Sequence, residues 1–268
     1  MGLFKKDVFG YYIILKKILI FVLGIVSHRR YHGFNKLKIE GMDILRYLPD
    51  DQVLFISNHQ TYFADVAAML HVFNAALNDR NDLSKPFKYL TNIKHNIYYV
   101  AAKETMESNL LSKIFKLVGA ITVERTWRAA GKEVKRPVKF SDISNIAKAI
   151  QNGWVITFPQ GTTRPFKPIR KGTAHIIKEN KPIVIPVVID GFRRAFDRKG
   201  LQIKKRGILQ TMVIKPPLPI DYENDTIEDI VEKIEYAIEQ HPDMIKVLPK
   251  EEIEKQQKLD EQRKFWKY

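Results

Sequence analysis

The chain of 268 residues contains no cysteine. This absence excludes disulfide bonds, zinc sites built on thiolates and a cysteine nucleophile, and it leaves the redox compartment open. Histidine is also scarce. The seven histidines are scattered, and no pair of them is joined with carboxylates at the spacing of metal ligands. We therefore expect no metal site, in a chain long enough for one large domain with short appendages.

The N-terminal segment lacks an uninterrupted apolar run of membrane-spanning length. Lys16 and Lys17 separate the apolar stretches 8–15 and 18–26, whereas a spanning helix needs about 20 consecutive apolar residues. Residues 1–38 carry eight Lys and Arg side chains against one Asp. The pattern predicts a membrane-associated helix or helix pair in residues 1–35 that lies in the interface, with its lysines reaching the lipid headgroups. A helix packed on the domain and a single span are the alternatives.

The 30 Asp and Glu side chains are outnumbered by 45 Lys and Arg side chains, which gives a formal net charge of +15. Such a balance favours an anionic partner, which can be a phospholipid surface, a nucleic acid or an acidic protein. No zinc-finger, helix-turn-helix or RNA-binding pattern is present, and the basic excess accompanies an apolar N-terminus. We therefore expect an anionic phospholipid membrane as the partner and no nucleic acid.

Between residues 36 and 243, short apolar runs alternate with helical patterns. The patterns predict strands at 53–57, 97–101, 120–124, 154–158 and 183–189, and helices at 64–77, 106–118, 141–151 and 173–179. This alternation predicts an α/β domain with a mixed, mostly parallel sheet flanked by helices.

Three other segments complete the prediction. Pro186 favours an edge or bulged position for the last of these strands. Two more strand candidates lie on either side of Gly207, in residues 201–215. Residues 244–268 form a charged C-terminal tail, solvated or disordered unless its aromatic tip touches a membrane.

Residues 57–65 carry the first recognisable chemistry. His59 falls in the turn expected after the strand 53–57, and Asp65 falls just inside the next helix. A carboxylate that fixes the tautomer of a histidine and stabilises its imidazolium makes the histidine a general base. The two residues can therefore form an acid-base dyad. The alternative is structural, with His59 at a strand end and Asp65 at a helix N-terminus.

Asn58 and His59 followed by Asp65 resemble the first motif of the glycerophospholipid acyltransferases, the family of the lysophosphatidate (1-acyl-sn-glycerol-3-phosphate) acyltransferases. Three later segments resemble its second, third and fourth motifs in order, at residues 119–125, 158–163 and 185–189. The resemblance covers residues 36–220. Two features depart from the family pattern. Five residues rather than four separate the His from the Asp, and Gln160 stands where the family has Glu.

The resemblance implies an O-acyltransferase of phospholipid biosynthesis. Its co-substrate would be a fatty acyl thioester, acyl-CoA or acyl carrier protein, and it would need no cofactor. The acceptor would be a hydroxyl of lysophosphatidate or a related lysolipid, at the cytoplasmic face of the inner or plasma membrane. His59 would be the base oriented by Asp65, and the hydroxyl would attack the thioester directly. Backbone N–H groups around Gly161 and Thr162 would stabilise the oxyanion.

The resemblance also assigns substrate binding to Asn58, Arg125, Gln160, Gly161, Thr162, Arg164 and Lys171. Arg125 is the expected phosphate clamp, because a guanidinium matches phosphate with two hydrogen bonds. A surface Arg is the alternative. Gln160 keeps the length of Glu but loses the charge and gains two donors. A lipid acceptor without phosphate (an amino-acid-type lipid), and a weak or inactive membrane-binding protein of the same fold, remain open.

Overall fold

A seven-stranded sheet forms the centre of the protein. The computed structural model describes residues 5–107, 110–124, 128–129, 132–133 and 140–245. Within them the sheet has the strand order β1-β9-β8-β2-β7-β3-β4. Its strands are β1 (Lys36–Glu40), β2 (Val53–Ser57), β3 (Ile97–Ala102), β4 (Ala120–Val123), β7 (Trp154–Thr157), β8 (Ile183–Asp190) and β9 (Leu209–Ile214).

Most neighbouring strands in this sheet run parallel. The strands β8, β2, β7, β3 and β4 form one parallel set. The strand β9 is antiparallel to β8 and parallel to β1. The predicted α/β domain with a mixed, mostly parallel sheet is therefore confirmed.

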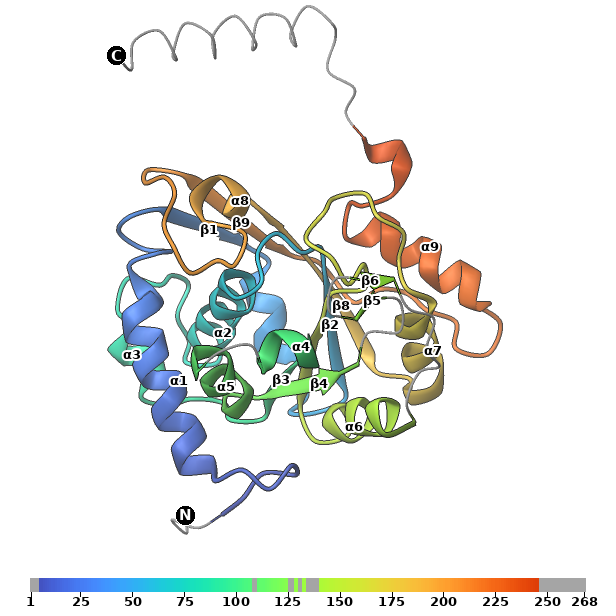
Figure 1. Cartoon of the computed structure of the whole chain (residues 1–268), viewed down its shortest axis with the longest axis horizontal. Helices are drawn as coiled ribbons and strands as arrows, with labels where there is room; N and C mark the ends of the chain where they lie inside the picture. Colours follow the sequence, from blue (N-terminus) through green and yellow to red (C-terminus); the bar gives the residue numbers. More distant parts are fainter. Residues whose placement is uncertain (1–4, 108–109, 125–127, 130–131, 134–139, 246–268) are drawn as a thin grey trace, which may run out of the picture.

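Helices cover both faces of the sheet (Figure 1). One face carries α1 (Ile13–His28), the 3-10 helix η1 (Met42–Tyr47), α2 (Ala64–Ala76), α3 (Phe87–Leu90) and α5 (Leu110–Leu117). The other face carries α6 (Phe140–Ile150), α7 (Lys171–Asn180) and α9 (Ile227–Ala237). Smaller elements are α4 (Lys103–Met106), α8 (Phe192–Ala195), η2 (Pro242–Met244) and an antiparallel pair, β5 (Arg128–Ala129) with β6 (Lys132–Glu133).

The central strands are apolar on both faces because both faces are covered. Every residue of β2 and of β7 is buried. Continuous apolar runs are typical of parallel strands between two helical layers. The edge strand β1 instead alternates exposed and half-buried residues. The carboxyl ends of β2 and β7, side by side in the middle of the sheet, carry the loops of the first and third motifs.

The N-terminal helix α1 packs one side against the domain. Its buried residues include Lys16, whose amine lies 3.5 Å from the carboxylate of Asp7 and 4.2 Å from the centre of the Tyr98 ring. Burial lowers the pKa of Lys16 to about 8, although Asp7 acts in the opposite direction. The expectation that this lysine reaches lipid headgroups is therefore wrong. No helix among the described residues is long and apolar enough to cross a bilayer.

Pro186 lies inside the sheet and not at its edge, which corrects the prediction for its strand. It is paired in register with Ile56 of β2, while β9 lies on the other side of β8. The ladder with β9 ends at the pair Val187 and Ile214, and beyond it the N–H of Lys215 donates to the carbonyl of Pro186. The nitrogen of Pro186, which carries no hydrogen, therefore points toward β9, just beyond the last pair of the ladder. The interior proline therefore stands where the ladder with β9 ends, and the sheet lacks only the one hydrogen bond that the proline nitrogen cannot donate.

Other boundaries differ from the sequence-based expectations. The helix predicted at 106–118 is divided into α4 and α5. Only the second strand candidate in 201–215 forms a strand, β9, while the first contributes one isolated bridge between Phe196 and Ile203. The sequence reasoning missed β1 and α9. The C-terminal tail from residue 246 lies outside the described residues. So does most of the segment 126–140, whose basic sequence predicts a linker.

Candidate active site

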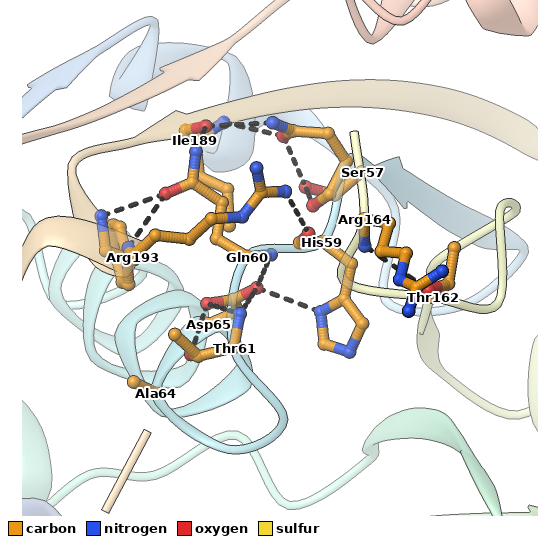
Figure 2. Close-up of polar contacts among 12 residues, drawn as sticks. Ser57, His59, Gln60, Thr61, Ala64, Asp65, Thr162, Arg164, Ile189 and Arg193 are labelled. Carbon is orange, nitrogen blue, oxygen red and sulfur yellow. Dashed lines mark hydrogen bonds and ion pairs between the residues drawn. The ribbon is translucent and has the colours of Figure 1, made fainter. Parts of the chain in front are cut away.

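The loop after β2 places His59 and Asp65 in direct contact. The Nδ1 atom of His59 lies 2.9 Å from Oδ2 of Asp65, whose side chain is fully buried (Figure 2). The same carboxylate accepts hydrogen bonds from the N–H of Gln60 at 2.6 Å and from the N–H and hydroxyl of Thr61 at 3.0 and 2.6 Å. The turn therefore closes around Asp65, and the longer spacing still brings the two side chains together.

Contact with the carboxylate decides how His59 presents its ring. An imidazole beside a carboxylate carries its hydrogen on the nitrogen that faces it, so Nε2 keeps a lone pair. The ring stacks on Phe158, with centroids 3.9 Å apart, and the ring centroid of Tyr62 lies 6.4 Å away. The His59 side chain is 13% exposed. This geometry provides a nitrogen that can take a proton from a hydroxyl.

Asn58 and Gln60 tie the loop after β2, which carries His59, to the end of β8. The side-chain amide of Asn58 donates to the carbonyl of Ile189 at 2.9 Å and accepts from its N–H at 2.8 Å. Oε1 of Gln60 accepts from the backbone N–H groups of Phe192 at 2.9 Å and of Arg193 at 3.2 Å. Asn58 therefore directs its amide into the protein, and its assignment to substrate binding stays a prediction.

Arg193 supports the same loop from α8. Its Nη2 donates to the carbonyl of His59 at 3.1 Å (Figure 2). Burial lowers the pKa of Arg193, and the charges of Asp65 and Asp190 act in the opposite direction. No sequence signal identifies this residue, because it lies far along the chain from His59. Gln60 and Phe158, in contrast, stand inside motifs that the sequence contains.

The loop after β7 carries four of the assigned residues. Gly161 has a left-handed backbone, with φ of 63°, and its N–H donates to the carbonyl of Phe158. That N–H is therefore occupied, which leaves the amide of Thr162 as the oxyanion donor to consider. The hydroxyl of Thr162 accepts from the N–H of Arg164 at 3.3 Å, and the side chain of Arg164 is exposed on the loop beside His59 (Figure 2).

Gln160 is turned into the protein. It is 1% exposed, and its Nε2 donates to the carbonyl of Lys167 at 2.8 Å and to Oε1 of Gln240 at 3.3 Å. These contacts fix the loop after β7 between residues 160 and 167, and they join this loop to the segment after α9. The role in substrate binding assigned to Gln160 stays a prediction.

Of the two remaining assigned cations, only Lys171 belongs to the described residues, and its partner lies on α9. Lys171, at the start of α7, forms an ion pair with Glu228 of α9, and both side chains are about two-thirds exposed. Arg125 lies outside the described residues. Among the described residues, no group of three or more His, Asp or Glu is placed to hold a metal ion.

An apolar pocket lies between α1 and α2, next to the loop that carries His59. Its free volume is small, about 40 Å³ on the scale used for protein cavities, and the pocket is partly open to solvent. Tyr62 and Phe63 line it where it meets this loop, and its walls include Ile20, Leu23, Val66, Leu70, Phe115 and Val118. His71 also lines it, and burial lowers the pKa of this histidine to about 3. The walls are therefore uncharged at neutral pH, which suits a hydrocarbon chain.

Comparison with known proteins identifies the class to which this site belongs. A family model described as Acyltransferase matches residues 36–190, more than half of the chain. The chain belongs to the acyltransferase family, which confirms the resemblance inferred from the four motifs.

Among solved structures, the fold is similar to the crystal structure of PlsC from Thermotoga maritima, a 1-acyl-sn-glycerophosphate (LPA) acyltransferase. The TM-score is 0.51 at 17% sequence identity, and the match covers 84% of this chain and 76% of that chain. At this identity the likeness shows a shared fold. No curated protein matches the chain.

Proposed function

We propose that the protein transfers a fatty acyl group from a thioester to a hydroxyl of lysophosphatidate or a related lysolipid, in phospholipid biosynthesis. The observation that carries this proposal is the hydrogen bond between His59 and Asp65, which leaves Nε2 available on a loop whose residues Tyr62 and Phe63 line an apolar pocket. The neighbour PlsC, described as an LPA acyltransferase, supports this acceptor class. A pocket for the acyl chain next to a general base is the minimum that the reaction requires.

Each step of the reaction has a group to serve it. Nε2 of His59 takes the proton of the acceptor hydroxyl as its oxygen attacks the thioester carbonyl. The amide of Thr162 is the proposed donor to the resulting oxyanion. The C–S bond then breaks, and the leaving thiolate takes the proton back from the imidazolium, whose charge Asp65 stabilises. The products are the acylated lipid and the free thiol.

Two classes of donor fit this scheme, acyl-CoA and acyl carrier protein. Each would act as a co-substrate, and the basic charge of the chain suits the anionic groups of both. On the acceptor side, Arg164 lies on the loop next to His59 and is the described cation best placed for a phosphate. Arg125 is the second proposed clamp for the acceptor phosphate. Gln160, Gly161 and Lys171 are the other residues proposed to bind the substrate in this part of the chain.

We further propose that the protein works at an anionic membrane on the cytoplasmic side. The support is a row of exposed apolar side chains on α1, at Ile14, Ile18, Val22 and Val26, each between 45% and 69% exposed. A helix with one apolar face against the domain and another in solvent suits an interfacial position. Membrane contact there would place the pocket beside the lipid phase.

Acyl transfer by purified protein tests the chemistry. Wild type, H59A and D65N would be assayed with lysophosphatidate and each thioester, and circular dichroism would check that all three are folded. We expect H59A to lose activity by at least about a hundredfold, because general base catalysis contributes on the order of 10²–10⁴. D65N should also lose activity while remaining folded. Full activity in folded H59A would remove His59 from the mechanism. No activity of the wild type with any donor would favour an inactive membrane-binding protein.

A further inference from the structure

Exposed apolar side chains are concentrated around α1. Among the described residues, seven of the thirteen large hydrophobic side chains with high exposure lie there, namely Tyr12, Ile14, Leu15, Ile18, Val22, Val26 and Phe87. Six of them come from α1 and the residue before it. Phe87 comes instead from α3, far along the chain, so the N-terminal segment does not supply the whole surface.

Phe87 lies against α1 but remains open to solvent. Its side chain is 62% exposed, although its ring centroid lies 6.1 Å from that of Phe21. Phe21 is half-buried and precedes Val22, a member of the exposed row on α1. Figure 1 shows α3 beside α1, and the two helices are in contact. Phe87 therefore flanks the exposed row and joins it in one surface, which we call the α1–α3 patch.

Two lysines stand next to Phe87. Lys85 and Lys88 are exposed, and neither forms an ion pair within the described part of the chain. The nearby carboxylate of Asp82 is already held by the N–H and hydroxyl of Ser84 and lies 3.6 Å from Arg80. The positive charge beside Phe87 is thus not neutralised locally, which fits an anionic surface.

We propose that Phe87, Lys85 and Lys88 form a second membrane contact, which binds an anionic phospholipid bilayer together with α1. This inference rests on the membrane part of the proposed function and extends it to a segment outside the N-terminus. An aromatic ring with flanking lysines suits the headgroup region, where the ring enters the interface and the ammonium groups meet lipid phosphates. Leu90 of α3 and Leu23 of α1 both line the apolar pocket, so contact on both helices brings the pocket to the lipid.

The absence of cysteine allows a site-specific test. In the full chain, F87C and the control Y47C would each carry an environment-sensitive fluorophore on its single thiol. Tyr47 of η1 is 87% exposed and is not part of the patch. With vesicles of phosphatidylglycerol and phosphatidylcholine, we expect the label at 87 to shift to the blue and to resist an aqueous quencher, while the label at 47 does not. A label at 87 that stays fully quenchable on vesicle-bound protein would overturn the proposal.

Vesicle sedimentation tests the charges. K85Q/K88Q should bind anionic vesicles about 25-fold more weakly than wild type, since each lysine near an anionic surface contributes about fivefold. K204Q/K205Q removes the same charge from two exposed lysines outside the patch that form no ion pair with a described residue. It should change binding by less than about threefold, as expected for a bulk charge effect. Equal losses in the two double variants, or no vesicle binding by wild type, would refute the contact.

A third variant separates this inference from the proposal on which it rests. I18S/V22S weakens only the row on α1. If it releases the protein from vesicles while K85Q/K88Q and the labelled F87C show no effect, the membrane role of α1 stands and the contact through α3 is wrong. All three readouts measure binding and not turnover, so a failure of the acyltransferase assay leaves them unaffected.

Discussion

Replacing Gln160 by glutamate (Q160E) puts the family's usual residue into this chain, where its surroundings oppose it. Nε2 of Gln160 donates to the carbonyl of Lys167 and to Oε1 of Gln240. Gln240 cannot simply turn its amide around, because its Oε1 also accepts from the N–H of Phe166 at 2.9 Å and its Nε2 donates to the carbonyl of Glu239 at 2.8 Å. Q160E would therefore place a carboxylate oxygen against two acceptors.

The size of the effect follows from the burial of the site, since Gln160 is only 1% exposed. The carbonyl of Lys167 would lose its donor, which costs about 1–3 kcal/mol, whereas Oε1 of Gln240 would keep the N–H of Phe166. A buried unpaired carboxylate adds several kcal/mol, limited by the option of taking up a proton. We expect Q160E to lose about 3–5 kcal/mol at neutral pH, a large part of the roughly 5–15 kcal/mol that stabilises a typical domain.

The pH dependence of the loss identifies the charge as its cause. Burial and the two acceptors would raise the pKa of the introduced carboxyl in the folded state above its unfolded value of about 4.3. A raised carboxyl pKa means that the folded state binds the proton more tightly. The penalty is therefore smallest below the unfolded pKa and grows as pH rises through the folded pKa. Q160M removes the same donors without adding charge, and its loss should not depend on pH.

Urea unfolding of wild type, Q160E and Q160M at about pH 7 and about pH 5 measures these differences. The expected order of stability at the higher pH is wild type, then Q160M, then Q160E, and the difference between the two variants should narrow at the lower pH. A Q160E protein as stable as wild type at neutral pH would refute the reasoning. It would mean that the introduced carboxylate finds a donor, and that glutamine is not required by its surroundings.

Three further perturbations address separate parts of the protein. R164A should raise KM for lysophosphatidate by about tenfold or more, because charge-assisted hydrogen bonds contribute about 1.5–3 kcal/mol, and it should leave KM for the thioester unchanged; an unchanged acceptor KM would favour a lipid without phosphate. R193M removes a positive charge that interacts with Asp65. The acidic limb of the pH profile of kcat/KM should therefore move to higher pH by up to about one unit. A merely structural role of Arg193 would lower kcat without moving that limb. Burial lowers the pKa of Lys16 to about 8, so above that pH the unfolded chain binds more protons than the folded protein. The free energy of unfolding of wild type should therefore rise by about 2 kcal/mol relative to K16M between about pH 8 and pH 9.5. Parallel pH profiles of the two proteins in urea unfolding would contradict this assignment.

The parts of the fold that were predictable carry their signal within a few residues. The strands β2 and β7 are continuous apolar runs bounded by polar turns, and their observed limits differ from the predicted ones by at most one residue. A buried parallel strand needs apolar side chains on both faces, so its composition alone identifies it. The helix α2 follows from the apolar stretch after the first motif in the same way.

The missed elements divide into two kinds. The charged sequence of β1 becomes a strand only by pairing with β9, which lies at the far end of the domain sequence. No local pattern predicts that pairing. The helix α9 was predictable, because Thr226 and Asp229 form a reciprocal capping box and Ile230 and Ile234 follow on one buried face. The signal for this helix is therefore local and present in the sequence.

The two departures from the family motifs are accommodated in different ways, and neither removes the dyad. The additional residue between His59 and Asp65 is taken up before α2 begins, because the carboxylate accepts the amides of Gln60 and Thr61 and the turn closes around it. That compensation is local. The orientation of Gln160 depends instead on Gln240, which no spacing within the motif could predict. Asp65 meets His59 at Nδ1, and Gln160 is turned toward Lys167 and Gln240, so a chain that departs from the family at two positions keeps Nε2 for the proposed reaction.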